Sequence, residues 1–342
     1  MEMEPPFEDL YKALSNKRSS INYDQSLLKP KDDVIVTESV ELPLIDLDRL
    51  NSGQLEYENC LNDMAEAATR WGFFQLINHG IPEDVLKRII HEQKKLFHQP
   101  FSNKSQPNFL NLSANSYRWG NPKATSLTQF HWSEAFHMSI SDISRIDQYH
   151  FSSLRKTIEE YSVKVDNLAQ RISELLATKL SSIKSSYFRD NCKPSSSYIR
   201  MNRYPPCPYS PNKITGLLPH TDSDFLTIVY QDRVGGLQLK RDNGSWVSVK
   251  PSTNVLSVNI GDLFQALSNG VYKSIEHRVI APQKVERLSI AYFLCPSHDV
   301  IIQSCSNKPP IYKNFSFKEY TLQIQRDVDS IGDKIGLSRF LF

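Results

Sequence analysis

The spacing of apolar residues changes near residue 195 and divides the chain into two halves. In the first half, apolar residues recur three or four positions apart, which is typical of amphipathic helices. This spacing predicts helices over residues 56–70, 82–97 and 154–175, with short apolar strands at 42–47 and 73–78. In the second half, apolar and polar residues alternate, as they do in strands with one buried face. Eight strands are predicted there, at residues 198–204, 216–220, 225–231, 236–240, 245–250, 255–259, 272–280 and 289–294.

The helix predicted over residues 154–175 has the most regular apolar stripe in the chain. Such a stripe forms either a coiled-coil seam or the buried face of one helix that packs along a sheet. Because strands follow it, the second arrangement is favoured. The stripe consists of Leu154, Ile158, Tyr161, Val165, Leu168, Ile172 and Leu175.

Turn signals separate the predicted strands, among them Pro205-Pro206, Asp242-Asn243-Gly244 and Asn269-Gly270. About eight short strands in roughly one hundred residues favour a double-sheet jelly roll. Farther on, Ser316 and Glu319 have the spacing of a capping box, which predicts a C-terminal helix. The expected fold is therefore α+β: a jelly-roll core (a double-stranded β-helix) with flanking helices, and one long helix packed along the barrel.

The same pattern divides the chain into segments. Residues 1–41 are polar and irregular, and we expect a loosely attached N-terminal arm. Residues 42–150 form an N-terminal region whose last part, from residue 100 on, is irregular and rich in aromatic residues, which is typical of a binding loop or substrate lid. The remaining segments are a long packing helix with a linker (151–194), the jelly-roll core (195–300) and a C-terminal helix with a tail (301–342).

Composition and charge are those of an ordinary soluble protein. Of the 342 residues, 39% are hydrophobic and 23% are charged, and the formal net charge is +2. We therefore expect neither a nucleic-acid nor a membrane surface. No apolar run has membrane-spanning length, and none near residue 1 has the character of a signal peptide. The five cysteines are scattered without a C-x-x-C pair, so we expect a reducing compartment, the cytoplasm or in addition the nucleus.

Candidate chemistry begins with His220 and Asp222, which lie two positions apart. On a strand this spacing places both side chains on one face, where an imidazole and a carboxylate can converge on a metal ion. Alone the pair is a weak signal, because two polar residues at a strand end can simply face water. His277 lies on another predicted strand that can face the pair across a jelly roll, and together the three form a set that suits non-haem Fe(II) and leaves coordination positions open. His131 and His137, six positions apart among aromatic residues, do not form an obvious metal pair.

Two further pairs share the two-residue spacing, Arg287 with Ser289 and Asn202 with Tyr204. A guanidinium beside a hydroxyl binds a carboxylate well, and the second pair can add donors to the same ligand. Each residue alone could be an ordinary surface or core residue, but their occurrence together favours one site. A 2-oxo acid fits it, with its keto and near carboxylate oxygens on the metal and its far carboxylate at Arg287. Oxidative decarboxylation of this 2-oxo acid consumes O₂, releases succinate and CO₂ and leads to hydroxylation of a nearby C–H bond. The protein positions the reactants and excludes water.

Two other functional classes remain open at this point. A jelly roll can act as a non-catalytic small-molecule binding protein, which would not need His220, Asp222 and His277 together. A zinc hydrolase is the weaker alternative, because the clamp of Arg287 and Ser289 would then have no ligand.

The candidate residues lie within longer motifs. These are LPLIDL at 42–47, WGFFQLINHG at 71–80, NRYPPCP at 202–208, HTD at 220–222, VGGLQ at 234–238, His277 and RLS at 287–289. Together they resemble the plant 2-oxoglutarate- and Fe(II)-dependent dioxygenases, over nearly all of residues 42–330. The resemblance implies that His220, Asp222 and His277 bind iron. It implies Fe(II), 2-oxoglutarate and O₂ as cofactor and co-substrates, and ascorbate as an optional activator. It also assigns binding of 2-oxoglutarate to Arg287, Ser289, Tyr204 and Asn202.

A narrower resemblance is to the gibberellin 2-oxidases, in particular the group that acts on twenty-carbon gibberellins. It is carried by SYRWG at 116–120, ATSL at 124–127, WSEAFH at 132–137, DFLTI at 224–228 and DLFQALSN at 262–269. It implies a gibberellin substrate and hydroxylation at the 2β position, which inactivates the hormone. Related dioxygenases that carry out gibberellin 20- or 3-oxidation, or that act on a flavonoid or an alkaloid, remain alternatives.

A gibberellin is a rigid apolar ring system with carboxylates, so its pocket should combine apolar walls with a polar anchor. Arg118 or His131 is expected to meet a carboxylate. For each candidate, packing in the core is an equally reasonable role. The expected partner is thus a small molecule, and the oligomeric state stays open. The candidate apolar wall consists of Tyr117, Trp132, Phe136, Phe225 and Phe293.

Overall fold

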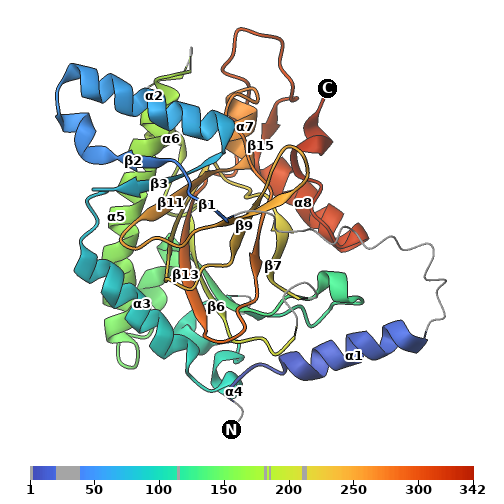
Figure 1. Cartoon of the computed structure of the whole chain (residues 1–342). Coiled ribbons are helices and arrows are strands. Elements are labelled where there is room, and N and C mark those ends of the chain that lie inside the picture. Colours follow the sequence, from blue (N-terminus) through green and yellow to red (C-terminus); the bar gives the residue numbers. More distant parts are fainter. Residues whose placement is uncertain (1–2, 21–38, 114–115, 181–182, 185, 210–213) are drawn as a thin grey trace.

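Two β-sheets form the centre of the computed structural model, which describes residues 3–20, 39–113, 116–180, 183–184, 186–209 and 214–342 (Figure 1). The larger sheet has the order β2 (Leu44–Asp46), β3 (Phe73–Ile77), β11 (Leu256–Ile260), β8 (Leu226–Gln231), β13 (Arg287–Leu294), β6 (Tyr198–Tyr204), β5 (Glu134–Ser139), β4 (Tyr117–Trp119). The smaller sheet has the order β1 (Ser39–Val40), β10 (Trp246–Val249), β9 (Leu237–Lys240), β12 (His277–Ile280), β7 (Thr215–His220). A third pair joins β14 (Ile301–Ile302) and β15 (Phe315–Ser316).

The larger and the smaller sheet pack face to face. Phe73 of β3 lies in one apolar cluster with Leu237 and Leu239 of β9 and with Val247 and Val249 of β10. This arrangement confirms the predicted α+β fold with a jelly-roll core. In the described part of the chain the strands form two large sheets and one two-stranded sheet, and not a closed barrel.

Within the strand-rich half, the segments around β12 and after β11 differ from the prediction. The strand predicted at residues 272–280 contains only β12, because Tyr272 turns its ring into the core and donates its hydroxyl to the carbonyl of Leu176. The short helix α7 (Asp262–Leu267) follows β11 and was not predicted. Its six residues are too few to show a helical period.

The long helix α5 (Ser152–Ala177) packs along β13 and β8 of the larger sheet and against α3 (Glu83–Phe97) (Figure 1). Six of the seven predicted stripe residues are buried, and Leu175 is partly buried. Packing on a sheet is therefore confirmed, and the coiled-coil interpretation is wrong. The other helices and 3₁₀ turns are η1 (Leu47–Asn51), α2 (Gln54–Arg70), α4 (Phe101–Lys104), η2 (Phe109–Asn111), η3 (Leu127–Gln129), η4 (Ile140–Arg145), α6 (Tyr187–Asn191) and η5 (Gly336–Phe340).

The N-terminal segment is more firmly attached than the sequence suggested. Residues 7–20 form α1 (Phe7–Ser20), and Phe7 and Leu14 are only 3% exposed. The ring of Phe7 stacks on Trp132 with centroids 4.9 Å apart. Glu4 accepts two hydrogen bonds from the Arg203 guanidinium, at 2.7 and 2.8 Å. The surface that holds this segment comes from distant parts of the chain, so a local pattern could not reveal it. Residues 1–2 and 21–38 of the expected arm lie outside the described residues.

The aromatic-rich stretch after residue 100 is partly sheet and not wholly irregular. Its strands β4 and β5 extend the larger sheet beyond β6. Alternate residues of this stretch therefore face opposite sides of the sheet. Only one of the two sides looks toward the space between the sheets.

The C-terminal helix begins where the capping box predicts. Ser316 Oγ accepts from the backbone N–H of Glu319, and the Glu319 carboxylate accepts from the backbone N–H of Ser316, so α8 (Phe317–Ile331) starts directly after it. The helix ends at Gly332, whose φ of 81° turns the chain back toward the sheets.

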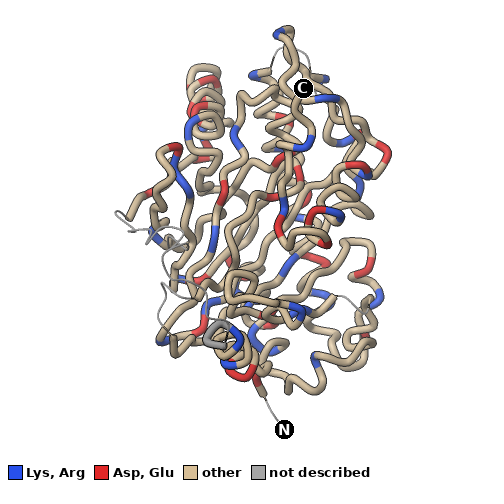
Figure 2. The backbone as a smooth tube through the Cα atoms, turned by 90° about the vertical axis from the view of Figure 1, so that its right-hand side faces the viewer, with Lys and Arg blue, Asp and Glu red and all other residues tan. Residues whose placement is uncertain are grey.

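Charged residues of both signs are intermixed along the described chain (Figure 2). Several pair on the surface, such as Arg88 with Glu160 at 2.6 Å. Among the described residues, no helix is long and apolar enough to cross a membrane.

Candidate metal centre and co-substrate site

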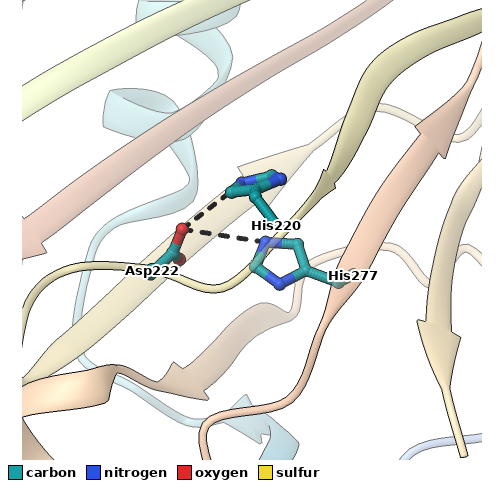
Figure 3. A group of neighbouring side chains, drawn as sticks. All are labelled: His220, Asp222 and His277. Atoms are coloured by element: carbon teal, nitrogen blue, oxygen red, sulfur yellow. Dashed lines mark ion pairs between the residues drawn. The ribbon is translucent and has the colours of Figure 1, made fainter. Parts of the chain in front are cut away.

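His220, Asp222 and His277 converge at the edge of the smaller sheet (Figure 3). The strands β7 and β12 are neighbours, and His220 and His277 are directly opposite each other in their register. Asp222 lies two residues beyond the end of β7, where the chain turns its carboxylate toward both imidazoles. Its Oδ1 is 3.4 Å from Nε2 of His220 and 3.8 Å from Nε2 of His277. One ligand atom from each residue lies within 4.8 Å of the others, so the three can bind one metal ion.

Both imidazoles are oriented by backbone carbonyls. Nδ1 of His220 is 2.8 Å from the carbonyl oxygen of Leu218, and Nδ1 of His277 is 3.1 Å from that of Ile275. Each Nδ1–H donates to its carbonyl, which leaves the Nε2 lone pair for a metal ion. Burial, together with the charge of His220, lowers the pKa of His277 to about 4, so His277 is neutral near pH 7 and able to act as a ligand.

Asp222 is held through one carboxylate oxygen. Its Oδ2 accepts from Thr227 Oγ1 at 2.7 Å and from Asn259 Nδ2 at 2.6 Å, and both donors belong to the larger sheet. The other oxygen, Oδ1, is thereby directed at the histidines. Burial alone would raise the pKa of Asp222, but its interactions with His277 and His220 and its hydrogen bonds outweigh burial and hold this pKa well below its ordinary value. Asp222 is therefore ionised.

A second carboxyl group, Asp224, lies beside Asp222 and shares a hydrogen-bond partner with it. Thr227 Oγ1 is 2.7 Å from Oδ2 of Asp224 as well as from Oδ2 of Asp222. A hydroxyl has one proton to donate, so it can donate to only one of the two carboxyl groups. Burial, and then the charge of Asp222, raises the pKa of Asp224 well above its ordinary value. The Thr227 hydroxyl therefore links the two carboxyl groups and ties Asp224 to Asp222.

The four predicted co-substrate residues lie on neighbouring strands of the larger sheet. In the register of β6 and β13, Arg287 is opposite Tyr204 and Ser289 is opposite Asn202. The Arg287 guanidinium lies over the Tyr204 ring, 4.8 Å from its centroid. Arg287 Nη1 and Asn202 Nδ2 are each 3.5 Å from Ser289 Oγ. The two-residue spacing in both strands thus brings all four to one face of the sheet.

Arg287 has the environment of a carboxylate-binding residue. Only 2% of its surface is exposed. Its Nη2 donates to Gln231 Oε1 at 2.5 Å, whereas its buried Nε has no hydrogen-bond partner among the described residues. A buried cation is costly unless it is paired, so an anionic ligand is the partner that this guanidinium fits.

Four of the residues predicted to line a substrate pocket are core residues instead. Tyr117 and Phe136 are opposite each other on β4 and β5 and pack together, with ring centroids 4.9 Å apart, on the sheet face covered by helices. Trp132 is buried against α1. Phe225 packs among aromatic rings of the main core. We therefore do not retain these four as substrate contacts.

The other three predicted pocket residues lie on the side of the larger sheet that carries the candidate site. Phe293 is six positions after Arg287 on β13 and so shares its face. Arg118 stands in the same cross-strand row as Asn202, with one residue of β5 between them. His131 forms a β-bridge with the first residue of β7.

On this face an aromatic wall is formed by the predicted Phe293 and by Tyr198, which sequence reasoning missed. Tyr198 stacks on Phe293 with centroids 4.4 Å apart and an interplanar angle of 14°, and its ring lies 4.3 Å from that of His137. Tyr198 is four positions before Asn202 on β6 and shares its face. The same two-residue spacing that found Asn202 could therefore have found Tyr198.

A cluster of cationic and imidazole groups completes the wall. Arg200 donates from Nε to Asn202 Oδ1 at 2.8 Å. Burial, followed by the charges of Arg200 and His220, lowers the pKa of His131 to about 3. Burial, followed by the charges of Arg200 and Arg118, lowers the pKa of His137 to about 4. Arg200 therefore lies near both imidazoles, and the arginines are the cationic groups of this wall near pH 7.

Comparison with known proteins shows which family the chain belongs to. Residues 195–296 match the 2OG-Fe(II) oxygenase superfamily, and residues 42–154 match the N-terminal region described for the non-haem dioxygenase in morphine synthesis. Gibberellin 2-beta-dioxygenase 8 of Arabidopsis thaliana is 51% identical to the chain over 342 residues, which cover 99% of both. The chain belongs to the 2OG-Fe(II) oxygenase superfamily. Gibberellin 2-beta-dioxygenase 6 of Oryza sativa subsp. japonica is 42% identical and covers 99% of this oxygenase and 96% of its own length.

Solved structures agree with this assignment. The crystal structure of JOX2 in complex with 2OG, Fe, and JA superposes on the oxygenase with a TM-score of 0.69 and 30% identity, over 90% of this chain and 91% of that one. As a superfamily member, the protein is a 2-oxoglutarate-dependent dioxygenase that uses Fe(II), 2-oxoglutarate and O₂. The sequence-based prediction of the enzyme class is confirmed, and the interpretations as a binding protein or a zinc hydrolase are set aside.

Proposed function

We propose that the enzyme hydroxylates a gibberellin at the 2β position, releases succinate and CO₂ and so inactivates the hormone. The observation that carries this proposal is the high identity to gibberellin 2-beta-dioxygenases over almost the whole chain. The aromatic and cationic wall beside the candidate metal centre supports it, since it suits an apolar acid.

The residues of the site divide into two groups in this proposal. His220, Asp222 and His277 hold the iron through Nε2, Oδ1 and Nε2. Bound iron supplies the redox chemistry in which O₂ and 2-oxoglutarate are consumed and a C–H bond is hydroxylated. The second group binds 2-oxoglutarate and consists of Arg287, Ser289, Tyr204 and Asn202.

Within this site, the protein groups orient the reactants. Arg287 and Ser289 offer a guanidinium fork and a hydroxyl to the far carboxylate of 2-oxoglutarate, and Tyr204 covers the guanidinium with its ring. Asn202 donates from Nδ2 to Ser289 Oγ, and its Oδ1 accepts from Arg200 Nε. It therefore connects the co-substrate site with the wall on which the substrate is proposed to lie.

The substrate wall accounts for a rigid apolar acid. The stacked rings of Tyr198 and Phe293 offer a flat apolar surface to fused rings. Arg200 and Arg118 are the cations near this surface, and a gibberellin carboxylate would pair with them.

Product analysis tests the proposed reaction. Purified enzyme with Fe(II) and 2-oxoglutarate should convert a gibberellin to a product heavier by one oxygen atom, with the hydroxyl at the 2β position and one succinate released per product. Twenty-carbon and nineteen-carbon gibberellins are compared in parallel by mass spectrometry, together with a panel of flavonoids. Turnover of a flavonoid with no turnover of any gibberellin would reject the proposal.

Replacing Arg200 by methionine should weaken substrate binding more than co-substrate binding. The loss of a charge-assisted hydrogen bond of about 1.5–3 kcal/mol corresponds to a rise of roughly 10- to 100-fold in KM for the gibberellin. The KM for 2-oxoglutarate should rise less, because Arg200 reaches that site only through Asn202. Steady-state kinetics with each substrate varied in turn checks this, with Arg326→Met, an exposed arginine on α8, as the control. An equal rise in both KM values would mean that Arg200 does not bind the substrate.

A further inference from the structure

A lysine near the C-terminal end of the chain contacts the loop that carries two of the proposed iron ligands. Lys334 Nζ donates to the carbonyl oxygen of Thr221 at 2.9 Å and to Ser223 Oγ at 2.7 Å, and it lies 2.6 Å from Oδ2 of Asp262. Thr221 is the residue between His220 and Asp222, and it is 113 positions away from Lys334 in the sequence. The ammonium group thus holds the peptide that connects two ligands.

Asp262 ties the same loop to two further elements. Its Oδ2 accepts from Thr221 Oγ1 at 3.0 Å and also from the hydroxyl of Tyr320 on α8. Its backbone N–H donates to the carbonyl oxygen of Asp222 at 2.9 Å. The side chains of Lys334 and Asp262 are 15% and 4% exposed, so water competes little for these contacts. The loop is therefore fixed from outside by α7, α8 and the C-terminal tail.

The local sequence directs Lys334 to this position. Gly332 ends α8 in a left-handed conformation with φ of 81°, and a Cβ there would come within 2.4 Å of Gln129 Nε2. The tail beyond the turn is held to α8 by Arg339, whose guanidinium pairs with Asp327 at 2.9 Å. This anchored turn returns the chain to the ligand loop within two residues.

We propose that Lys334 is a positioning residue for the iron site. Its ammonium group fixes the peptide between two of the ligands, so that the ligand atoms of His220 and Asp222 are held together before the metal binds. Residues that orient metal ligands typically contribute 10- to 100-fold in metal affinity. The inference rests on the proposed assignment of His220, Asp222 and His277 as ligands.

The sign of the effect separates positioning from electrostatics. A positive charge close to the site repels a divalent cation, so an electrostatic role alone predicts that removing the charge tightens metal binding. A positioning role predicts the opposite result, because the loop loses its two hydrogen bonds to the ammonium group and Asp262 loses its ion pair with it. One measurement of metal affinity therefore decides between the two roles.

Titration calorimetry with Co(II) on the metal-free enzyme provides that measurement. We expect Lys334→Met to raise the Kd for Co(II) by roughly 10-fold or more, while Lys318→Met, an exposed lysine on α8, leaves it unchanged. Lys334→Gln keeps a hydrogen-bond donor without the charge and should give an intermediate Kd. If Lys334→Met does not fold, the Kd of Lys334→Gln is compared with that of wild type instead. The melting temperature of each metal-free variant reports general stability separately.

Two results would overturn the inference. One is a Kd for Co(II) in the Lys334 variants that is unchanged or lower, and the other is a loss of metal-free stability without a loss of affinity. Failure of the proposed function looks different. If wild type binds Co(II) through Asp222 but hydroxylates no gibberellin, the substrate assignment fails and the role of Lys334 stands. If Asp222→Ala binds Co(II) as wild type does, the ligand assignment fails, and the inference fails with it.

Discussion

Replacing Asp222 by alanine should abolish succinate release and gibberellin turnover and should weaken Fe(II) binding by more than about 100-fold. That limit is the upper end of the effect for residues that only support metal ligands. Asp222 is the one carboxylate in the proposed ligand set, and its loss leaves only the two imidazoles. It would also leave the buried donors Thr227 and Asn259 without their acceptor. Anaerobic Fe(II) titration and succinate assays measure both effects.

The matched control for this prediction is Asp242→Ala. Asp242 is an exposed carboxylate that pairs with Lys273 at 3.0 Å on the surface, where ion pairs contribute little. This variant should bind Fe(II) and release succinate as wild type does. Asp222→Asn sharpens the test, because it keeps the shape and the acceptor oxygen but removes the charge. Undiminished succinate release in Asp222→Ala would refute the ligand assignment.

Arg287→Met should cause the largest defect in co-substrate binding. Removing one partner of a buried, hydrogen-bonded charge pair costs about 2–5 kcal/mol, which is at least a roughly 30-fold rise in KM for 2-oxoglutarate. The far carboxylate would lose its guanidinium in a pocket where Arg287 itself is only 2% exposed. Iron binding should change little, because the three proposed metal ligands remain. Kinetics with 2-oxoglutarate varied, beside Fe(II) titration, checks both statements.

The stability of the Arg287 variants tells a binding role from a structural one. In the absence of ligand, the buried Nε has no partner among the described residues, so the guanidinium is poorly compensated. Arg287→Met should therefore leave the melting temperature of the ligand-free enzyme unchanged or raise it. Arg287→Lys keeps the charge but loses the planar fork, and its KM should lie between those of wild type and Arg287→Met. A severe loss of ligand-free stability, without a specific rise in KM, would mean that Arg287 is a structural residue.

The candidate site followed from the sequence because strand geometry is local. Two residues at positions i and i+2 share a face whatever surrounds the strand, so Arg287 with Ser289 and Asn202 with Tyr204 came together as predicted. The long helix was predictable for the same reason, because its buried stripe lies within one continuous segment, the 26-residue helix α5.

The substrate wall could be predicted only in part, because the sequence pattern does not show which face of a strand packs against which neighbour. Tyr117 and Arg118 are adjacent on β4, yet Tyr117 packs under the helices and Arg118 shares the face of Asn202. The aromatic residue was the more conspicuous candidate, and it faces the wrong side. Arg200 lies two positions before Asn202 on β6. The spacing that identified Asn202 and Tyr204 therefore also places Arg200 on their face of the sheet.

The attachment of α1 has a consequence for the order in which the chain can fold. Glu4 pairs with Arg203, 199 positions later, and the apolar cluster under Phe7 includes Ala281. A helix of 14 residues is marginally stable by itself in water. During synthesis, α1 is made well before Arg203 and Ala281, so its docking surface does not exist until those residues have been added. We therefore expect α1 to be among the last of the helices to dock.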